Sequence, residues 1–442
     1  MDMLIRLDAY IDKDLLESDK RSHGFLEKLS NLMTVEEAID YIFEAESADN
    51  VNTLYEMLGE NDIAIISSNH FYDVYEKMKI MKDDIGLDLL LVYKVAAPVI
   101  DPENRAVRAN IFDVINYMRN RTSKGNIVYF SVNPVWRMVM LYVLRKAFPV
   151  IKIILYIYDW LNLVCPYQHR EVLQKFLNLP MAYIENEYRV LDLILKGDIV
   201  NGILHKDGGD DFHVLKDFPL PNLFFPAYLP KRLYQEPACE VRKPNTFVYL
   251  GRLYSPLEFV PELFSDAFIF DILDTISKQD FYIDLFYVRS PYATIRMYND
   301  YFKDNKKIKM IEGKPLNCLL PDIAKKYHWG YLINNYRDDF SLIRQHVEAA
   351  LPARIFTFMA LGIPVVINEE IKFAADFIRQ NQVGVVVAQK DIPDLSNALK
   401  RADYRTLQEN VLSVRERLCL ENNKNRFVEF LISSINATAV QP

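Results

Sequence analysis

Residues 351–370 read LPARIFTFMALGIPVVINEE. Pro352 suits the first turn of a helix, where its missing N–H costs no hydrogen bond. Gly362 suits the position just past a helix end, and Pro364 prevents the helix from continuing. The apolar run PVVIN that follows is typical of a buried strand. This stretch therefore predicts a short helix followed by a strand of a parallel sheet.

The predicted helix has one apolar face and one basic residue in its first turn. The apolar face comprises Leu351, Ile355, Phe358 and Met359. Arg354 lies in the first turn, where a guanidinium can make paired hydrogen bonds to phosphate oxygens. The N-terminus of a helix also offers unpaired N–H groups to an anion. We therefore expect a phosphate site here, although an ordinary helix–strand unit with a surface arginine shows the same pattern.

Strands and helices alternate on both sides of this stretch. Short apolar segments rich in β-branched and aromatic residues are separated by amphipathic segments, which is typical of parallel α/β domains. In the second half, the predicted strands are 246–253, 282–288, 307–313, 329–335, 363–368 and 384–389. In the first half, they are 62–68, 87–95, 126–132 and 151–158. The last fifty residues, from about Asp391, are expected to be helical.

These two series predict an α/β protein with two Rossmann-like, doubly wound domains that face each other across a cleft. A chain of 442 residues also exceeds what one hydrophobic core usually organises. The predicted units are an N-terminal domain with an extra helical segment (1–228), a proline-rich linker (229–245), a C-terminal domain (246–420) and a terminal helix (421–442). We expect the terminal helix to pack back on the N-terminal domain.

Three motifs of the second half resemble the donor domain of GT-B glycosyltransferases. Residues 351–370 are similar to the signature whose helix holds a nucleoside diphosphate. FVYLGRLYSP (247–256) resembles the first strand of that domain, which ends in Gly-Arg-Leu and whose arginine contacts the diphosphate. KIKMIEGKPL (307–316) resembles a strand-glycine element whose backbone approaches the nucleotide base.

The resemblance is good over residues 246–400. It is weaker over 62–228, which is similar to transferases of teichuronic-acid and capsule synthesis, and residues 1–60 resemble no family. It implies a GT-B fold, an acceptor-binding first domain, and transfer of a sugar from a nucleotide-sugar, UDP-sugar above all, to a glycan, lipid-linked or protein acceptor. Such enzymes belong to surface polysaccharide or glycoconjugate synthesis, and they need neither a cofactor nor a protein-bound metal.

The resemblance also assigns site residues. The donor diphosphate is expected at Gly251, Arg252 and Arg354. Contacts to the nucleotide or sugar are expected at Glu312, Gly313, Asn335, Glu348, Pro352 and Thr357.

The sequence departs from the family pattern at two places. Many retaining members carry a spaced pair of glutamates around this motif, but the matching positions here are Ala349 and Thr357, with Glu348 one register away. Many also carry a lysine shortly after Gly-Arg, and LYSPLEF has none. Two alternatives therefore stay open: a GT-B homologue that binds or supports another transferase, and a nucleotide-sugar epimerase.

Polar residues follow the predicted strands of the first domain. His70, Asn133 and Asp159 come after the first, third and fourth strands. The carboxyl ends of parallel strands converge on one crevice, so these side chains are expected to face an acceptor. A general base must deprotonate the acceptor hydroxyl in an inverting transfer, and histidine or a carboxylate suits this task. We expect His70, ahead of Asp159, although residues at strand ends are also common helix caps.

Composition excludes several other classes of protein. The net charge of -8 argues against a dedicated nucleic-acid binder. The four cysteines form no CxxC pair, which argues against zinc and disulfide scaffolds. HKDGGDDF (205–212) lacks the spacing of a calcium loop and is expected to be a solvated turn.

The expected location is the cytoplasm, because no signal peptide or membrane-spanning segment is recognisable. The basic, apolar segment 134–152 has two interpretations. It is a core helix with basic ends, or an amphipathic helix in peripheral contact with the inner membrane surface.

Overall fold

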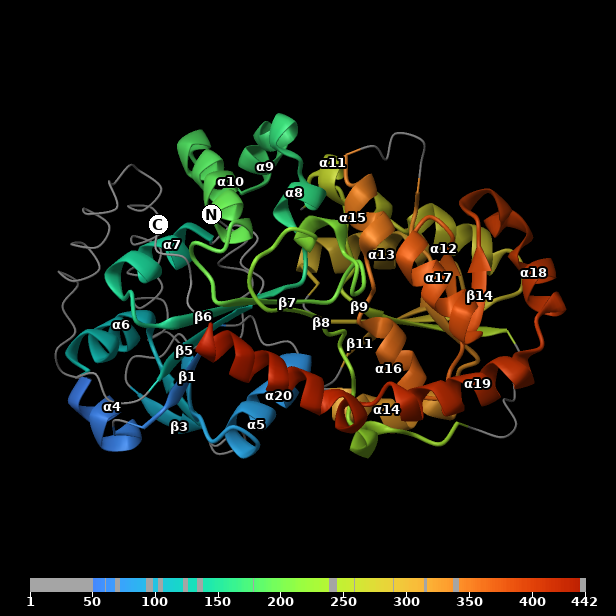
Figure 1. Cartoon of the computed structure of the whole chain (residues 1–442). Helices are drawn as coiled ribbons and strands as arrows, with labels where there is room; N and C mark the ends of the chain where they lie inside the picture. Colours follow the sequence, from blue (N-terminus) through green and yellow to red (C-terminus); the bar gives the residue numbers. More distant parts are fainter. Residues whose placement is uncertain are drawn as a thin grey trace.

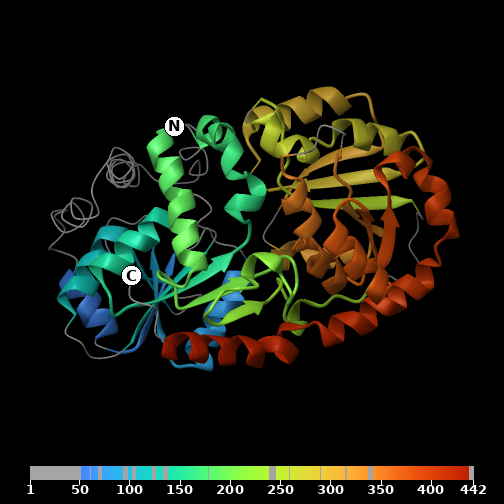
Figure 2. The same ribbon diagram turned by 45° about the horizontal axis from the view of Figure 1, so that its top comes forward.

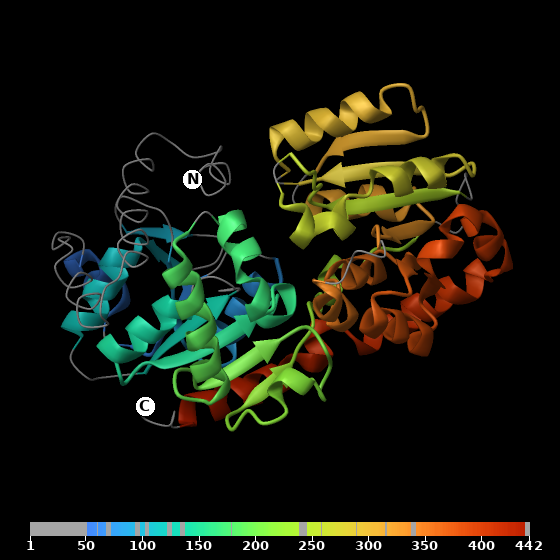
Figure 3. The same cartoon turned by 90° about the horizontal axis from the view of Figure 1, so that it is seen from above.

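The structure, a computed structural model, describes residues 51–59, 61–67, 72–92, 98–101, 106–121, 126–132, 138–177, 179–237, 245–257, 259–288, 290–313, 316–336 and 342–437. Its element labels begin at α4 (Val51–Leu58). Two α/β domains lie side by side, each built on one central sheet (Figures 1 and 3).

The N-terminal sheet has eight strands in the order β3-β4-β2-β1-β5-β6-β7-β8. The strands are β1 (Ile63–Ser67), β2 (Asp88–Val92), β3 (Val99–Asp101), β4 (Ala106–Ala109), β5 (Ile127–Val132), β6 (Lys152–Ile157), β7 (Gly202–His205) and β8 (Asn222–Phe224). Strand β3 runs antiparallel to β4, and the other pairs are parallel. The helices are α5 (Tyr72–Asp83), α6 (Ile111–Asn120), α7 (Met138–Ala147), α8 (Leu161–Val164), α9 (Arg170–Leu177) and α10 (Met181–Leu195).

The C-terminal sheet has six parallel strands in the order β11-β10-β9-β12-β13-β14. The strands are β9 (Thr246–Gly251), β10 (Tyr282–Tyr287), β11 (Ile308–Glu312), β12 (Trp329–Leu332), β13 (Val365–Asn368) and β14 (Gly384–Val387). In sequence order this is 3-2-1-4-5-6, the arrangement of a doubly wound nucleotide-binding sheet. The strand order reverses between β9 and β12, so ligands are expected at the carboxyl ends of these two strands.

Helices cover both faces of the C-terminal sheet. The helices of this domain are α11 (Pro261–Phe264), α12 (Phe270–Ser277), α13 (Tyr292–Phe302), α14 (Leu316–Ala324), α15 (Arg344–Ala349), α16 (Arg354–Ala360), α17 (Lys372–Asn381), α18 (Leu395–Arg401) and α19 (Tyr404–Arg417). The last helix of the chain, α20 (Leu420–Asn436), lies outside this domain. Helix α16 packs on β12 with almost no space between them, because a Cβ on Gly330 would lie 2.5 Å from the ring of Phe358. The two-domain α/β architecture predicted from the sequence is confirmed.

Strand alternation divides the C-terminal core in two. Along β9, Val248 and Leu250 belong to a cluster that also contains residues of α16 and of the N-terminal domain. Phe247 and Tyr249 point to the other face, into a separate cluster beneath α12 and α13. This two-sided burial explains why β9 has an uninterrupted apolar sequence.

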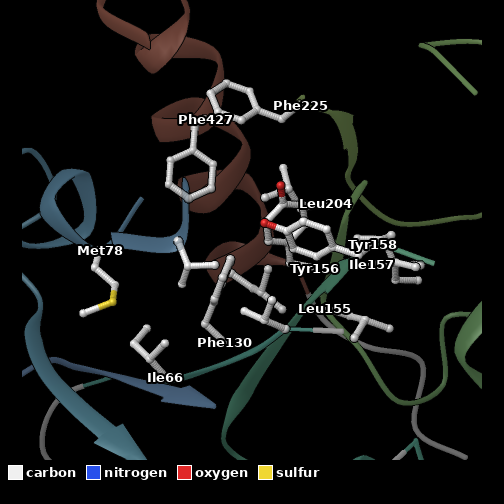
Figure 4. Close-up of a cluster of buried hydrophobic side chains, with 14 of the residues drawn as sticks. Ile66, Met78, Phe130, Leu155, Tyr156, Ile157, Tyr158, Leu204, Phe225 and Phe427 are labelled. Atoms are coloured by element: carbon white, nitrogen blue, oxygen red, sulfur yellow. The ribbon is translucent and has the colours of Figure 1, made fainter. Parts of the chain in front are cut away.

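The last helix returns to the first domain. After α19, helix α20 runs along the underside of the N-terminal sheet (Figures 2 and 3) and contacts α5, β6, β7 and β8. Phe427 is fully buried there, and its ring centroid lies 5.5 Å from that of Phe225 (Figure 4). Lys152 Nζ and Asn201 Nδ2 donate to the Ala437 carbonyl oxygen at 3.0 and 2.9 Å, so side chains of the first domain satisfy the end of this helix.

The described part of the 134–152 segment favours the core interpretation. Helix α7 buries Met138, Leu141, Val143 and Leu144. Arg145 is buried as well, and its Nε donates to the Ile199 carbonyl oxygen at 2.8 Å, so it is a structural residue of the first domain. Among the described residues, no helix combines the length and apolar character needed to cross a bilayer.

Four strands were not expected from the sequence: β3, β4, β7 and β8. They have three or four residues each, so their periodicity is too short to recognise. Strand β8 lies among the prolines and is an edge strand, the position at which proline is tolerated beside a sheet.

The packing of α20 on β7 predicts the effect of one added methyl group. A Cβ on Gly202 would lie 2.2 Å from Ser434 Oγ and 2.9 Å from its Cβ. Gly202→Ala should therefore lower the free energy of unfolding by about 1–3 kcal/mol, as overpacking does. The double variant G202A/S434G should recover part of this loss, which denaturant unfolding of both variants would measure. Equal stability of wild type and G202A would contradict this packing.

Candidate functional site

The two predicted arginines both contact Tyr249 at the end of β9, Arg354 through its side chain and Arg252 through its backbone. Arg354, the first residue of α16, reaches across β9, and its Nη1 donates to the Leu250 carbonyl oxygen at 3.4 Å. Its guanidinium carbon lies 5.0 Å from the centre of the Tyr249 ring. Tyr249 in turn donates its hydroxyl proton to the Arg252 carbonyl oxygen. One buried tyrosine therefore links the two arginine positions.

Gly251 lies beside Arg354 at the end of the strand. Its φ is +148°, a conformation that residues with a side chain rarely adopt. A Cβ at this position would lie 3.7 Å from Arg354 Cδ and Nη1, which is an ordinary van der Waals contact. The glycine is therefore explained by its backbone conformation and not by lack of space.

Arg252 is held by aromatic rings. Its guanidinium carbon lies 4.9 Å from the Phe259 ring centre and 5.7 Å from that of Tyr254. Its Nε is buried and has no hydrogen-bond partner in the described structure. Burial raises the pKa of Tyr254 to about 12, while the charges of Arg252 and Arg354 partly oppose this rise. The positive charges of both arginines therefore act on Tyr254.

The other predicted donor contacts differ in their surroundings. Asn335 is 5% exposed, and its amide donates to the Phe268 carbonyl oxygen at 3.2 Å, so it holds the loop after β12. Glu348 forms an ion pair with Lys372 at 2.7 Å. Thr357 lies within α16, and Pro352 precedes the helix, both half-buried.

Glu312 and Gly313 end β11, two strands away from β9 and hence about 10 Å from it. Glu312 is exposed. Gly313 donates its N–H to the Tyr287 carbonyl oxygen at 2.8 Å, and a Cβ there would lie 2.4 Å from Val288 Cγ1. Gly313 is therefore required by packing against β10.

Of the polar residues predicted to face an acceptor in the first domain, the structure describes Asp159. His70 and Asn133 lie outside the described residues. Asp159 follows β6 at the boundary with the second domain, and its Oδ1 lies 3.7 Å from Nε2 of His346 on α15. The charge of Asp159 also contributes to the raised pKa of Tyr254, the residue beside Arg252. Asp159 thus contacts the second domain through His346, although it comes from the first.

The turn at 205–212 is solvated only in part: Asp210 and Asp211 are exposed as expected, but the first residues are not. His205, Lys206 and Asp207 are 0%, 8% and 1% exposed, because this loop is packed between the two domains. Lys206 Nζ lies 2.9 Å from Asp207 Oδ1 and 4.0 Å from Asp159 Oδ1. The sequence carried no signal for this burial, because the strand that precedes the loop, β7, is itself too short to recognise.

Asp159, Asp207 and His346 also have the chemistry of metal ligands, and their ligand atoms lie within 4.8 Å of one another. However, the Lys206 ammonium already places a positive charge against both carboxylates. The group is therefore an ion-pair network that joins the domains. Helices α8 and α15, one from each domain, contact each other and can be followed in Figure 1.

Asp266 is a further carboxylate that the sequence did not reveal. Its Oδ2 accepts a hydrogen bond from Asn334 Nδ2 at 3.0 Å, and its carbonyl oxygen accepts one from the Asn335 N–H at 2.7 Å. Burial raises the pKa of Asp266 to about 6, and the charge of His346 partly opposes this rise.

Two solved structures are similar in fold to this chain over nearly their whole length. HepE of Anabaena, in complex with UDP, matches with a TM-score of 0.56 at 10% identity, over 84% of this chain and 100% of HepE. An α-glucosyltransferase in complex with UDP and a 13-mer DNA matches with a TM-score of 0.52 at 12% identity, over 84% and 99%. At such identities the likeness concerns the fold alone, and that fold is GT-B.

A comparison with protein families finds a match that lies almost entirely in the second domain. Residues 272–424 match the family described as glucosyltransferase 3-like, C-terminal domain. No curated protein sequence matches the chain. The chain therefore has the GT-B fold, and most of its second domain is similar to the C-terminal domain of glucosyltransferase 3-like proteins. This confirms the resemblance seen in the sequence.

The raised pKa of Asp266 predicts a pH-dependent effect on stability. The folded state binds this proton more tightly than the unfolded chain, whose pKa is near 3.8, so Asp266 lowers stability as pH rises from about 4 to 6. Asp266→Asn keeps an acceptor for Asn334 and removes the charge. It should raise the free energy of unfolding at pH 7.5 by on the order of 1 kcal/mol, since the group is partly exposed. The gain should vanish below pH 4, as urea unfolding at both pH values would test.

Proposed function

We propose that this protein transfers a sugar from a UDP-sugar to a glycan or lipid-linked acceptor, without a bound metal. The observation that carries the proposal is the pair of guanidinium groups, Arg252 and Arg354, at the point where the C-terminal strand order reverses. The structures of HepE and of the α-glucosyltransferase hold UDP, which supports a uridine nucleotide as the ligand. The matched family name supports a hexose such as glucose.

The two arginines suit the chemistry of donor cleavage. When the glycosidic bond to the donor breaks, negative charge develops on the leaving diphosphate. Fixed guanidinium groups stabilise such charge without reorganisation, and they take the role that a metal ion plays elsewhere. Tyr249 fixes both positions, because its ring contacts Arg354 and its hydroxyl binds the Arg252 backbone.

The acceptor is proposed to enter from the side of the first domain. Asp159 is proposed as its base, since its side chain is 43% exposed and meets His346 of the second domain at the boundary. We extend the proposal to surface glycan or glycoconjugate synthesis in the cytoplasm, where a lipid-linked acceptor would bring the protein to the inner membrane surface.

A second candidate function rests on Thr357. This residue occupies the position of a glutamate in many retaining relatives, so the protein would bind a nucleotide and support another transferase without turnover of its own. Binding of UDP without release of sugar across a panel of acceptors would favour this candidate over the first.

Removal of either arginine should abolish donor use. Arg252→Ala and Arg354→Ala should each lower turnover of UDP-glucose about a hundredfold or more, because each removes a donor that stabilises developing charge. UDP at a hundred times its Kd should raise the free energy of unfolding of the wild type by about 2.7 kcal/mol and so raise its melting temperature. Both variants should lose this rise in melting temperature. Arg405→Ala, at an exposed position of α19, is the matched control. Wild-type turnover in both site variants would refute the assignment.

The base is tested by a separate pair of variants. Asp159→Asn should lower kcat by about 10²–10⁴-fold, as loss of a general base does, while the affinity for UDP stays unchanged. His70→Ala should then retain turnover, and Asp217→Asn, at an exposed position, is the control. Rate measurements at saturating acceptor would distinguish the two residues. Loss of turnover in His70→Ala alone would transfer the role to His70.

A further inference from the structure

The loop after β7, His205–Gly209, is hereafter called the junction loop. It belongs to the first domain, yet its polar groups bind the backbone of the second. The Gly208 N–H donates to the Ala349 carbonyl oxygen at 2.9 Å. The Leu351 N–H donates to Asp207 Oδ1 at 2.8 Å. These two bonds hold residues 349–351, the segment between α15 and α16.

This segment sets the position of Arg354. Leu351 is only three residues before Arg354, and the Pro352 carbonyl oxygen already accepts the Ile355 N–H at 3.0 Å. A displacement of Leu351 would therefore move the start of α16 and the guanidinium that crosses β9. No residue of the second domain supplies the acceptor for the Leu351 N–H in the described structure, because Asp207 does so.

The conformation of the junction loop is specific. Gly208 has φ +74°, and a Cβ there would lie 1.9 Å from the Phe212 ring, so the turn requires glycine. Gly209 has φ +75°, and its hypothetical Cβ would lie 3.0 Å from the ring of Phe373 on α17, in the second domain. The loop is thus shaped to fit against the second domain at two points.

A buried carboxylate in this position has an energetic cost that its partners reduce. Burial raises the pKa of Asp207, and the neighbouring Lys206 and His346 charges oppose that rise. Lys206 Nζ contacts both Asp207 oxygens, at 2.9 and 3.1 Å. Burial of a charge costs stability even when the charge is paired. The hydrogen bond to the Leu351 N–H is the contact by which Asp207 can specify the geometry of the second domain.

We propose that Asp207 is a positioning residue for the donor site: from the first domain, it fixes the start of α16 and so orients Arg354 toward the nucleotide diphosphate. The donor site is then complete only when the two domains are docked through the junction loop. This inference rests on the proposed function, and it adds a residue of the acceptor side that controls donor affinity.

The test compares two substitutions at one position in the full-length protein, with UDP as the ligand. Asp207→Ala removes the acceptor for the Leu351 N–H and should raise the Kd for UDP at least tenfold, which corresponds to 1.4 kcal/mol. Asp207→Asn keeps a side-chain oxygen for this bond and should remain within about threefold of the wild type. The KM for the acceptor should not change in either variant. Asp211→Ala, exposed in the chain just after the loop, is the matched control.

Titration calorimetry distinguishes the possible failures. If the wild type does not bind UDP, the proposed function is overturned and this inference with it. If the wild type and D207A bind UDP equally, the inference alone is overturned. If D207N loses as much affinity as D207A, the hydrogen bond is not the means of positioning, and the proposal is rejected.

A second measurement needs no variant and therefore does not depend on whether D207A folds. Coupling between two sites is reciprocal, so UDP bound near Arg354 must strengthen the bonds at residues 349–351. Hydrogen exchange of the wild type should show slower exchange of the Leu351 amide with saturating UDP. Unchanged exchange at this amide, in a protein that binds UDP, would overturn the proposal.

Discussion

The strand order of the C-terminal sheet reverses between β9 and β12, and the candidate site depends on this reversal. The chain leaves the two neighbouring strands in opposite directions, so their carboxyl ends remain open to a ligand. Gly251 ends one of these strands, and Arg354 begins the helix that packs against the other. The close contact of Phe358 with Gly330 holds that helix on β12. A site for an anion therefore follows from the way in which the sheet is wound.

Aromatic residues make this arrangement rigid. Tyr249 lies between Arg354 and the Arg252 backbone, while Phe259 and Tyr254 support the second guanidinium. Such contacts attract a cation without neutralising it, unlike a carboxylate partner. Both guanidinium groups thus keep their charge available for an anionic ligand.

The two domains depend on each other for structure. Helix α20 comes last in the chain but is buried in the first domain through Phe427. The junction loop makes the reverse connection, since Asp207 of the first domain satisfies the Leu351 N–H of the second. Because backbone groups and apolar surface are shared across the boundary, the relative position of the domains is part of the site.

Local sequence determined much of this protein. The apolar runs at β1, β5, β6, β9 and β13 predicted strands because a parallel sheet must be apolar on both faces, and Pro352 and Gly362 bracketed α16 by their backbone preferences. Arg252 and Arg354 were found because each lies within a motif of neighbouring residues.

Only the tertiary structure decided the rest. The contact of Asp159 with His346, the burial of Asp207 and the raised pKa of Asp266 all join segments far apart in the chain. Electrostatics and burial depend on distances in space, and a sequence pattern carries only the distances along the chain.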